Sequence, residues 1–346
     1  MNKWPNWTSY AAMSALLLQF EQGAFAQDGT QCPPASGVSV QHTPLNVNPD
    51  GTAGSYTPGD HGFTYIANGL NLYENRTIIG CSGTMSRRCR QLFLQAEAQD
   101  FGPGSPTFCV YAIEVVGYTP GTEAPGCDPR RPYRRLLGDG RGRPRPGPPI
   151  ANVTGTQSPT YVSTTSLQHT VGGRRVYLDS ATIPVLVAPR DELLGAVAWL
   201  RLGDRSTFAI FGDSGPRLGE GSIALHQYLL YGALQPPQPI GPIPVSERCG
   251  RLERSIRAPF KASPDPGDEC RAGRAYTSVS DIRGYANIDD PVDVVILEEV
   301  RLPRNSNVIP TEVTPRALEQ IAAEAGYTSS RLAGLADCSR RALPRR

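Results

Sequence analysis

Glycine and proline make up a fifth of this 346-residue chain, with 36 and 33 residues respectively. Both are poorly tolerated inside helices, where glycine costs about 1 kcal/mol and proline about 3 kcal/mol relative to alanine. The composition therefore favours short strands joined by loops over an all-helical fold. The chain is also long enough to bury a substantial core.

The densest strand pattern lies between residues 160 and 235. Apolar and β-branched residues occur there in short runs bounded by glycine, proline and aspartate, which is typical of a β-rich domain. Two of the runs flank the sequence Gly203-Asp204-Arg205, which predicts a hairpin. The predicted strands cover residues 160–167, 175–179, 182–189, 193–202 and 207–212 and, elsewhere in the chain, 108–116 and 292–300.

Two segments favour helices. Residues 222–230 are consistent with a short helix or a strand, and a helix is favoured because alanine, leucine and glutamine, which are good helix formers, dominate the segment. Near the C-terminus, Thr314 is a suitable N-cap, Pro315 suits the first helical position, and Gly326 is a typical helix stop. We therefore expect one short helix within the strand-rich region and one C-terminal helix.

These elements predict a mainly β fold of the β-rich α+β class. A single domain over residues 61–310 should form a compact small β-barrel with long disulfide-stapled loops, and a double-psi barrel is one form suggested by analogy. We expect an Arg/Pro/Gly-rich loop at 118–150 and an insertion at 235–285. Residues 27–60 are predicted to be an extended arm, and residues 311–346 a C-terminal helix and tail.

Residues 1–26 have the pattern of a secretory signal peptide. Residues 10–18 form an apolar stretch that is too short to span a bilayer, and Ala24-Phe25-Ala26 supplies a cleavage motif. An uncleaved anchor is the alternative interpretation. We expect a secreted protein, extracellular or periplasmic, with no membrane partner after cleavage.

Eight cysteines follow the predicted cleavage site, and an even number in an exported chain indicates disulfides. Their order does not determine the pairing. The chain has no Cys-x-x-Cys motif and its four histidines are scattered, so we expect no metal site and no cofactor. Pairing between near neighbours is the simplest choice, namely Cys81 with Cys89, Cys109 with Cys127, and Cys249 with Cys270.

The net charge of +2 does not indicate a nucleic-acid partner. Seven arginines nevertheless lie between Arg130 and Arg145, in a stretch rich in proline and glycine. This stretch is consistent with a solvated loop or with a basic patch for an acidic polymer. Tyr133 is its only aromatic residue, so it lacks the interleaved rings that stack on nucleic-acid bases.

Two carboxylates, Asp213 and Glu220, lie in one glycine-punctuated turn between two apolar segments. The end of a strand can hold such side chains rigidly. Two carboxylates at a fixed separation are the minimum equipment for cleaving a glycosidic bond, with one as general acid and the other as base or nucleophile. The alternative interpretation is an ordinary turn at Asp213 and a helix cap at Glu220.

Four motifs follow one another over about 70 residues, or a fifth of the chain. They are Tyr161-Val-Ser-Thr-Thr-Ser-Leu167, Tyr177-Leu-Asp-Ser-Ala-Thr-Ile-Pro184 with Val185 to Pro189, Ala209-Ile-Phe-Gly-Asp213 with Gly215-Pro216, and Gly219-Glu220-Gly-Ser-Ile-Ala-Leu225. In this order they resemble motifs of the family 75 glycoside hydrolases, the chitosanases of fungi and bacteria.

The resemblance implies an endo-acting, inverting hydrolysis of a β-1,4-linked glucosamine polymer, with no metal. It places the catalytic acids at Asp213 and Glu220. We assign Glu220 as general acid and Asp213 as base, although the sequence does not fix which is which. Asp179, Tyr161 and Trp199 are predicted to bind substrate, the acid by pairing with amines and the rings by stacking on sugars. A turn acid and core aromatic residues are the alternative interpretation.

The chain departs from the family pattern at three places. An Asp-x-Asp-Gly element usually found upstream has no counterpart near Gly80-Cys-Ser-Gly83, and Gln168-His169 replaces a frequent aspartate. Val185 replaces a tyrosine. Fewer acids would weaken the attraction for a polycationic substrate.

Three functions therefore remain open. The first is a chitosanase-like hydrolase with a polysaccharide substrate, which we expect to be a monomer. The second is a peptidoglycan-active lytic enzyme on a related barrel, for which one acid suffices. The third is a non-catalytic extracellular protein of the same fold. The intact pair of Asp213 and Glu220 favours the first.

Overall fold

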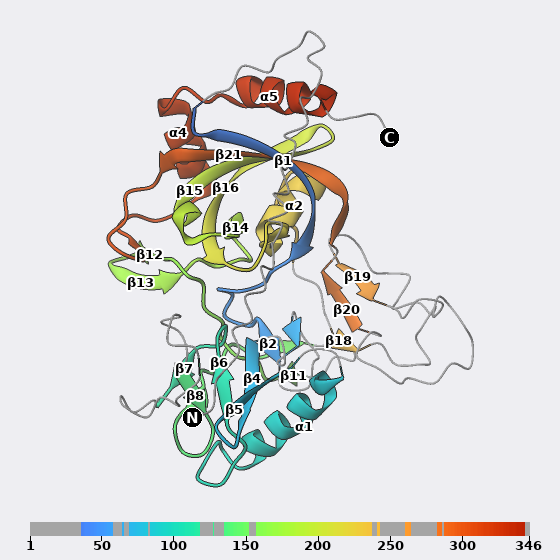
Figure 1. Ribbon diagram of the computed structural model, residues 1–346, viewed down its shortest axis with the longest axis vertical. Coiled ribbons are helices and arrows are strands. Elements are labelled where there is room, and N and C mark those ends of the chain that lie inside the picture. Colours follow the sequence, from blue (N-terminus) through green and yellow to red (C-terminus); the bar gives the residue numbers. More distant parts are fainter. Residues whose placement is uncertain are drawn as a thin grey trace, which may run out of the picture.

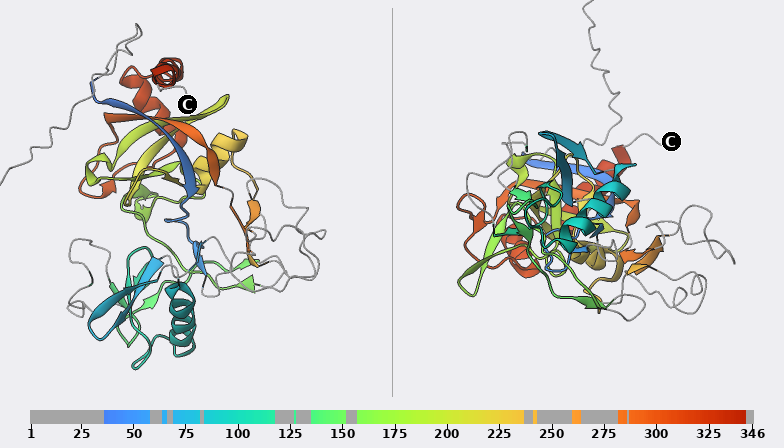
Figure 2. Two further views of the ribbon diagram at one scale, coloured as in Figure 1. Left: turned by 45° about the vertical axis from the view of Figure 1, so that its right-hand side comes forward. Right: turned by 90° about the horizontal axis from the view of Figure 1, so that it is seen from below.

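The computed structural model describes residues 36–57, 64–65, 69–81, 84–117, 127, 135–151, 157–236, 241–242, 260–263, 282–285 and 287–342. The predicted signal peptide and most of the predicted insertion at 235–285 lie outside these residues. A strand-rich barrel forms one end of the structure and a smaller α+β unit the other (Figure 1, Figure 2). The prediction of a β-rich fold with a small closed barrel is confirmed.

Six strands close the barrel in the order β1-β17-β14-β16-β15-β21 (Figure 1). β1 pairs in parallel with β17 and antiparallel with β21, which completes the ring. β14 and β16 are also parallel, whereas β15 and β16 form the predicted antiparallel hairpin. The barrel strands are β1 (Val38–Val47), β14 (Val185–Ala188), β15 (Ala196–Leu202), β16 (Arg205–Ser214), β17 (Glu220–Gly221) and β21 (Ile288–Arg301).

Three of the described helices pack on the barrel. Thr314 is the predicted N-cap of α4, and α2, whose cap was not predicted, begins after Ser222. The hydroxyl oxygen of Ser222 accepts the N–H of Leu225 at 3.1 Å, and that of Thr314 accepts the N–H of Ala317 at 3.1 Å. A second C-terminal helix, α5, was not predicted. Among the described residues, no helix combines the length and apolar character needed to cross a membrane. The helices are α2 (Ile223–Tyr231), α4 (Pro315–Glu324) and α5 (Ser329–Ala342).

The barrel strands bury side chains on both faces, which accounts for their unbroken apolar runs. In β15, Val197 and Trp199 belong to one hydrophobic cluster, and Ala198 and Leu200 belong to another. Side chains of α4 and α5 complete the first cluster, and side chains of α2 complete the second. Because successive side chains of a strand point to opposite faces, each helix layer covers its own set of residues.

The smaller unit is a four-stranded sheet in the order β5-β4-β6-β8 with helix α1 against it (Figure 1). Its core is aromatic, since the ring centroid of Phe93 lies 5.3 Å from that of Phe101, 6.0 Å from Phe108 and 5.7 Å from Tyr161. This cluster is separate from the clusters of the barrel, so residues 61–310 do not share the one continuous core that was predicted. The elements are α1 (Met85–Ala98), β4 (Leu70–Glu74), β5 (Thr77–Gly80), β6 (Phe108–Val110) and β8 (Arg135–Leu137).

Short strands make up the remaining sheets. β13-β12-β22 and β18-β20-β19 are three-stranded, and β2-β3, β7-β9 and β10-β11 are pairs. Their bounds are β2 (Tyr56–Thr57), β3 (Thr64–Tyr65), β7 (Val115–Val116), β9 (Arg143–Pro144), β10 (Ile150–Ala151), β11 (Gln157–Ser158), β12 (Gln168–Val171), β13 (Arg174–Tyr177), β18 (Gly241–Pro242), β19 (Phe260–Ser263), β20 (Ile282–Tyr285) and β22 (Val308–Ile309). A 3-10 helix spans Asp191–Leu193.

Two segments predicted to be irregular contain strands. The expected extended arm at 27–60 includes β1, a barrel strand whose partners β17 and β21 come much later in the chain. The expected loop at 118–150 includes β8, and Leu136 and Leu137 of that strand are fully buried. Both corrections have one cause: long-range pairing orders stretches whose local composition resembles a loop.

Two disulfides agree with the predicted near-neighbour pairing. Cys81 is bonded to Cys89, and Cys109 is bonded to Cys127. Both staple the smaller unit, where they lie at or beside its sheet and helix. The predicted pair of Cys249 and Cys270 lies outside the described residues.

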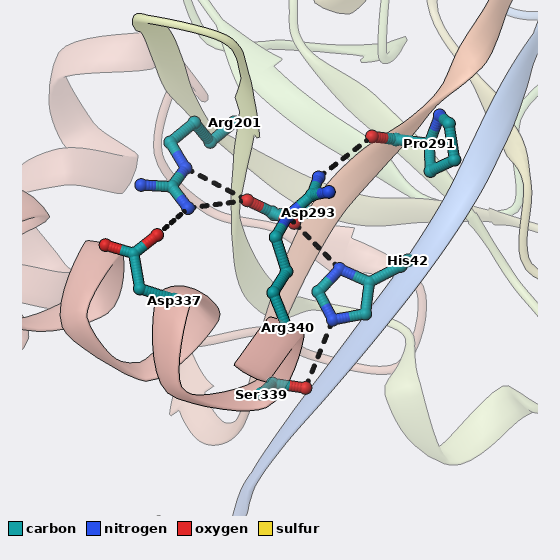
Figure 3. Close-up of polar contacts among 7 residues, drawn as sticks. All are labelled: His42, Arg201, Pro291, Asp293, Asp337, Ser339 and Arg340. Carbon is teal, nitrogen blue, oxygen red and sulfur yellow. Dashed lines mark hydrogen bonds and ion pairs between the residues drawn. The ribbon is translucent and has the colours of Figure 1, made fainter. Parts of the chain in front are cut away.

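A buried carboxylate, Asp293 of β21, joins α5 to the barrel (Figure 3). Its side chain is 2% exposed and is contacted by His42 Nδ1 at 2.7 Å, Arg201 Nε at 2.9 Å and Arg340 Nε at 2.6 Å. Ser339 Oγ lies 3.1 Å from His42 Nε2. Serine hydrolases also align a carboxylate, an imidazole and a hydroxyl. Here the guanidinium groups of Arg201 and Arg340 bond to the carboxylate of Asp293. The network therefore compensates the buried negative charge and attaches α5 to the barrel.

Replacing Asp293 with alanine is predicted to lower the free energy of unfolding by about 3–5 kcal/mol, because its cationic partners then lose their anion. Urea unfolding at neutral pH measures this loss. Glu298→Ala is the control, since it breaks an exposed pair with Arg190 and should cost less than about 1 kcal/mol. Equal losses in the two variants would contradict this role of Asp293.

Candidate active site

Glu220 is held at the barrel by the two-residue strand β17, which lies between β1 and β14. Asn46 of β1 is its register partner, and the N–H of Asn46 donates to the carbonyl of Gly219 at 2.8 Å. On the other side, Gly221 pairs with Leu186 of β14. The side chain of Glu220 is partly exposed, so its carboxyl is anchored by two strands and still reaches solvent.

Asp213 stands near the end of β16, where its register partner is Val187 of β14. Its Oδ1 accepts two hydrogen bonds from Ser166, one from the backbone N–H at 3.0 Å and one from the hydroxyl at 2.9 Å. The N–H of Leu167 donates to the carbonyl of Gly212 at 2.9 Å. The Thr-Ser-Leu segment therefore lies along the end of β16 and fixes the carboxyl.

Strand β14 separates the two predicted catalytic acids. Gly221 is paired with Leu186, and Asp213 is paired with the next residue, Val187. Two strand spacings put the backbones of Asp213 and Glu220 about 10 Å apart. Rotation of the side chains can then reach the separation of about 6.5–9.5 Å at which an acid and a base act on opposite sides of one bond.

A third carboxylate, Asp50, lies beside this pair and was not predicted from the sequence. As the chain leaves β1, the N–H of Asn48 donates to the carbonyl of Gly221 at 2.7 Å. The chain then turns at Gly51, which has a φ of +93°. A Cβ at that position would lie 1.9 Å from the carbonyl oxygen of Leu178, so the turn requires glycine.

A sequence signal for Asp50 existed. Asn48-Pro49-Asp50-Gly51 has the composition of a tight turn that presents an aspartate directly before a glycine. The turn after β1 is the part of the chain that brings an Asp-Gly pair to the two acids.

Burial is the largest cause that raises the pKa of both Asp50 and Asp213 above that of an ordinary aspartate. For Asp50 the pKa is raised well above it, and the charge on Asp213 adds to the effect. For Asp213, hydrogen bonds from Ser166 and Ser214 lower the pKa and the charge on Glu220 raises it. The cluster can thus retain a proton at a pH where an exposed aspartate has lost it.

Asp179, a predicted substrate-binding residue, lies in the turn before β14 and has a clear structural role. Its Oδ1 accepts the N–H of Ala181 at 3.0 Å and the hydroxyl of Thr52 at 3.0 Å. It also lines a cavity of about 780 Å³, together with Arg174 and Arg175 of β13. Neither of the two predicted catalytic acids lines this cavity, so Asp179 is not grouped with them.

The two predicted stacking residues are part of the hydrophobic cores. Tyr161 is 7% exposed in the aromatic core of the smaller unit, and its hydroxyl donates to Glu97. Trp199 is 1% exposed in the barrel, and its Nε1 has no hydrogen-bond partner among the described residues. Neither ring has a free face for a sugar. The burial of both rings does not support the predicted stacking on sugars, because Tyr161 packs in the aromatic core of the smaller unit and Trp199 in the core of the barrel.

The site is therefore a cluster of three carboxyl groups, from β16, β17 and the turn after β1. Within the described ranges, no three histidine, cysteine or acidic side chains are grouped closely enough to hold a metal ion. No protein-family model matches the chain, and a search of curated proteins finds no significant match. A function must therefore be argued from the residues of the site.

Ser166→Ala is predicted to raise the pH at which Asp213 ionises, because the lost hydroxyl hydrogen bond stabilises the carboxylate and lowers its pKa. Titration of the aspartate carboxyl carbons by ¹³C NMR measures the change. Ser206→Ala, at an exposed position of the β15–β16 hairpin, is the matched control. Ionisation of Asp213 at the same or a lower pH would be the contradictory result.

Proposed function

We propose that this chain is a secreted polysaccharide hydrolase that cleaves a β-1,4-linked glucosamine polymer internally by an inverting mechanism. The observation that carries the proposal is the strand order β17-β14-β16, which sets Glu220 and Asp213 on either side of β14. The ordered resemblance to the family 75 glycoside hydrolases supports the choice of substrate.

In the proposed reaction, Glu220 gives its proton to the leaving glycosidic oxygen as the bond to the anomeric carbon breaks. Asp213 takes a proton from a water molecule, whose oxygen attacks that carbon from the opposite face. The products are one new reducing end of inverted configuration and one free hydroxyl. Each acid changes its protonation state once, and bulk water restores both.

A polycationic substrate is supported by the acidic character of the site. Asp213 is the acid that the mechanism keeps ionised, and its negative charge attracts protonated amines. Asp179 is proposed to contact a sugar further along the polymer, where it lines the cavity.

Export is supported by the disulfides of the smaller unit, because such bonds persist in oxidising compartments. The signal-peptide pattern at the N-terminus agrees with export. We accordingly propose that the enzyme acts outside the cytoplasm on an extracellular or cell-wall polymer.

A peptidoglycan-active lytic enzyme is the second candidate, and one observation favours it. Arg174 and Arg175 line the cavity, and neither has an acidic partner in the part of the chain that the structure describes. Unpaired guanidinium groups suit an anionic polymer better than a polycation. A non-catalytic extracellular protein of this fold is the third candidate.

Asp213→Asn and Glu220→Gln are each predicted to lower the rate of reducing-end release from chitosan by about 10²–10⁴-fold, because each removes a proton-transfer group without changing its shape. The assay uses the purified mature chain, with peptidoglycan and cellulose in parallel. Glu319→Gln, on the exposed side of α4, should retain wild-type activity.

Release of reducing ends from peptidoglycan alone would overturn the proposed chitosanase activity in favour of the second candidate. Inactivity of the folded wild-type protein on all three polymers would favour the third. Full activity of both active-site variants would show that these carboxyl groups are not the catalytic pair.

A further inference from the structure

Asp50 is the third acid of the site, and it takes no part in the proton transfers of the proposed reaction. It follows β1 directly, and the hydrogen bond from Asn48 to Gly221 ties its turn to the strand that carries Glu220. On its other side, the N–H of Gly51 donates to the hydroxyl of Ser163 at 2.7 Å. Asp50 is therefore fixed between the strand of Glu220 and the segment that holds Asp213.

The groups that face Asp50 are two acids and a phenol. Asp213 approaches from β16, Glu220 from β17 and Tyr56 from β2. None of these is a cation, and no basic side chain bonds to Asp50 among the described residues. Simultaneous ionisation of neighbouring buried acids is unfavourable, so the cluster favours a state in which one of them holds a proton.

The hydrogen bonds indicate which acid that is. Asp213 accepts the N–H and the hydroxyl of Ser166 and the N–H of Ser214, and each donor stabilises an ionised carboxylate. In the described structure the carboxyl of Asp50 accepts one hydrogen bond, from the hydroxyl of Tyr56 at 2.9 Å. The better-solvated charge is therefore on Asp213, and the proton belongs on Asp50.

We propose that Asp50 is a positioning residue that holds a proton beside Asp213, so that Asp213 stays ionised and can serve as the base. The role of Asp50 in catalysis rests on the proposed function, whereas the location of the proton on Asp50 does not. Ionisation of Asp50 at higher pH would return a proton to Asp213 or place two charges side by side. Asp50 would then set an upper pH limit for the reaction.

The pH dependence of stability tests this without any substrate. Burial and the charge on Asp213 raise the pKa of Asp50 in the folded state above the value of about 3.9 in an unfolded chain. The folded wild-type protein thus binds the extra proton and loses stability as pH rises through the folded pKa. Asp50→Asn removes this loss, so the variant should gain stability relative to wild type from pH 4 to pH 8.

Urea unfolding across this range measures the difference, with Glu319→Gln as an exposed control that should follow wild type. A difference between Asp50→Asn and wild type that is constant with pH would overturn the proposal. Because no substrate is present, this result is independent of whether the protein hydrolyses chitosan.

A second measurement does not depend on the folding of Asp50→Asn. In ¹³C NMR of the wild-type protein, the Asp50 carboxyl should remain protonated to a higher pH than that of Asp213. Tyr56→Phe should move the Asp50 transition to still higher pH, because the lost hydrogen bond favoured the ionised form and lowered the pKa. Ionisation of Asp50 before Asp213 would overturn the assignment.

For an active enzyme, Asp50→Asn should extend the alkaline limb of the pH–rate profile to higher pH, because the asparagine cannot ionise beside Asp213. If Asp50 served folding alone, the variant would give less active protein but the limb would stay at its wild-type pH. That result would overturn the positioning role.

Discussion

The insertion of Glu220 and Gly221 between β1 and β14 is the contact on which both the barrel and the site depend. Ser222 secures it, since its hydroxyl donates to the carbonyl of Ile183 at 2.7 Å and accepts the N–H of Val185 at 2.9 Å. The same oxygen caps α2. One buried serine thus joins two strands and starts a helix, and the acid two positions earlier is held as a consequence.

This construction places acids where they are unfavourable for stability. Burial and neighbouring carboxyl groups raise the pKa of Asp50 and of Asp213, and in the described structure no cation compensates either acid. Asp293 shows the opposite arrangement, in which two arginines and a histidine surround a buried acid. The contrast distinguishes an acid that docks a helix from acids that are kept able to exchange a proton.

Local signals allowed part of this structure to be predicted from the sequence. The hairpin of β15 and β16, helix α2, the capped start of α4, and the two near-neighbour disulfides each depend on residues close together in the chain. β1 could not be predicted in this way, because Val38 finds its partner at Leu297. The proximity of Asp50 to Asp213 has the same origin. Trp199 was predicted to stack on a sugar but is buried in the barrel. The sequence could not separate the two, because tryptophan serves both as a core residue and as a surface for stacking.

The stereochemistry of the product tests the central claim most directly. In ¹H NMR of a short chitosan oligomer digested by the wild-type protein and recorded before mutarotation, the new reducing end should appear first as the α-anomer, because a water molecule held by one acid attacks opposite a bond protonated by the other. Initial formation of the β-anomer would contradict the inverting pair. The absence of any cleavage by the folded protein would contradict the hydrolase assignment itself.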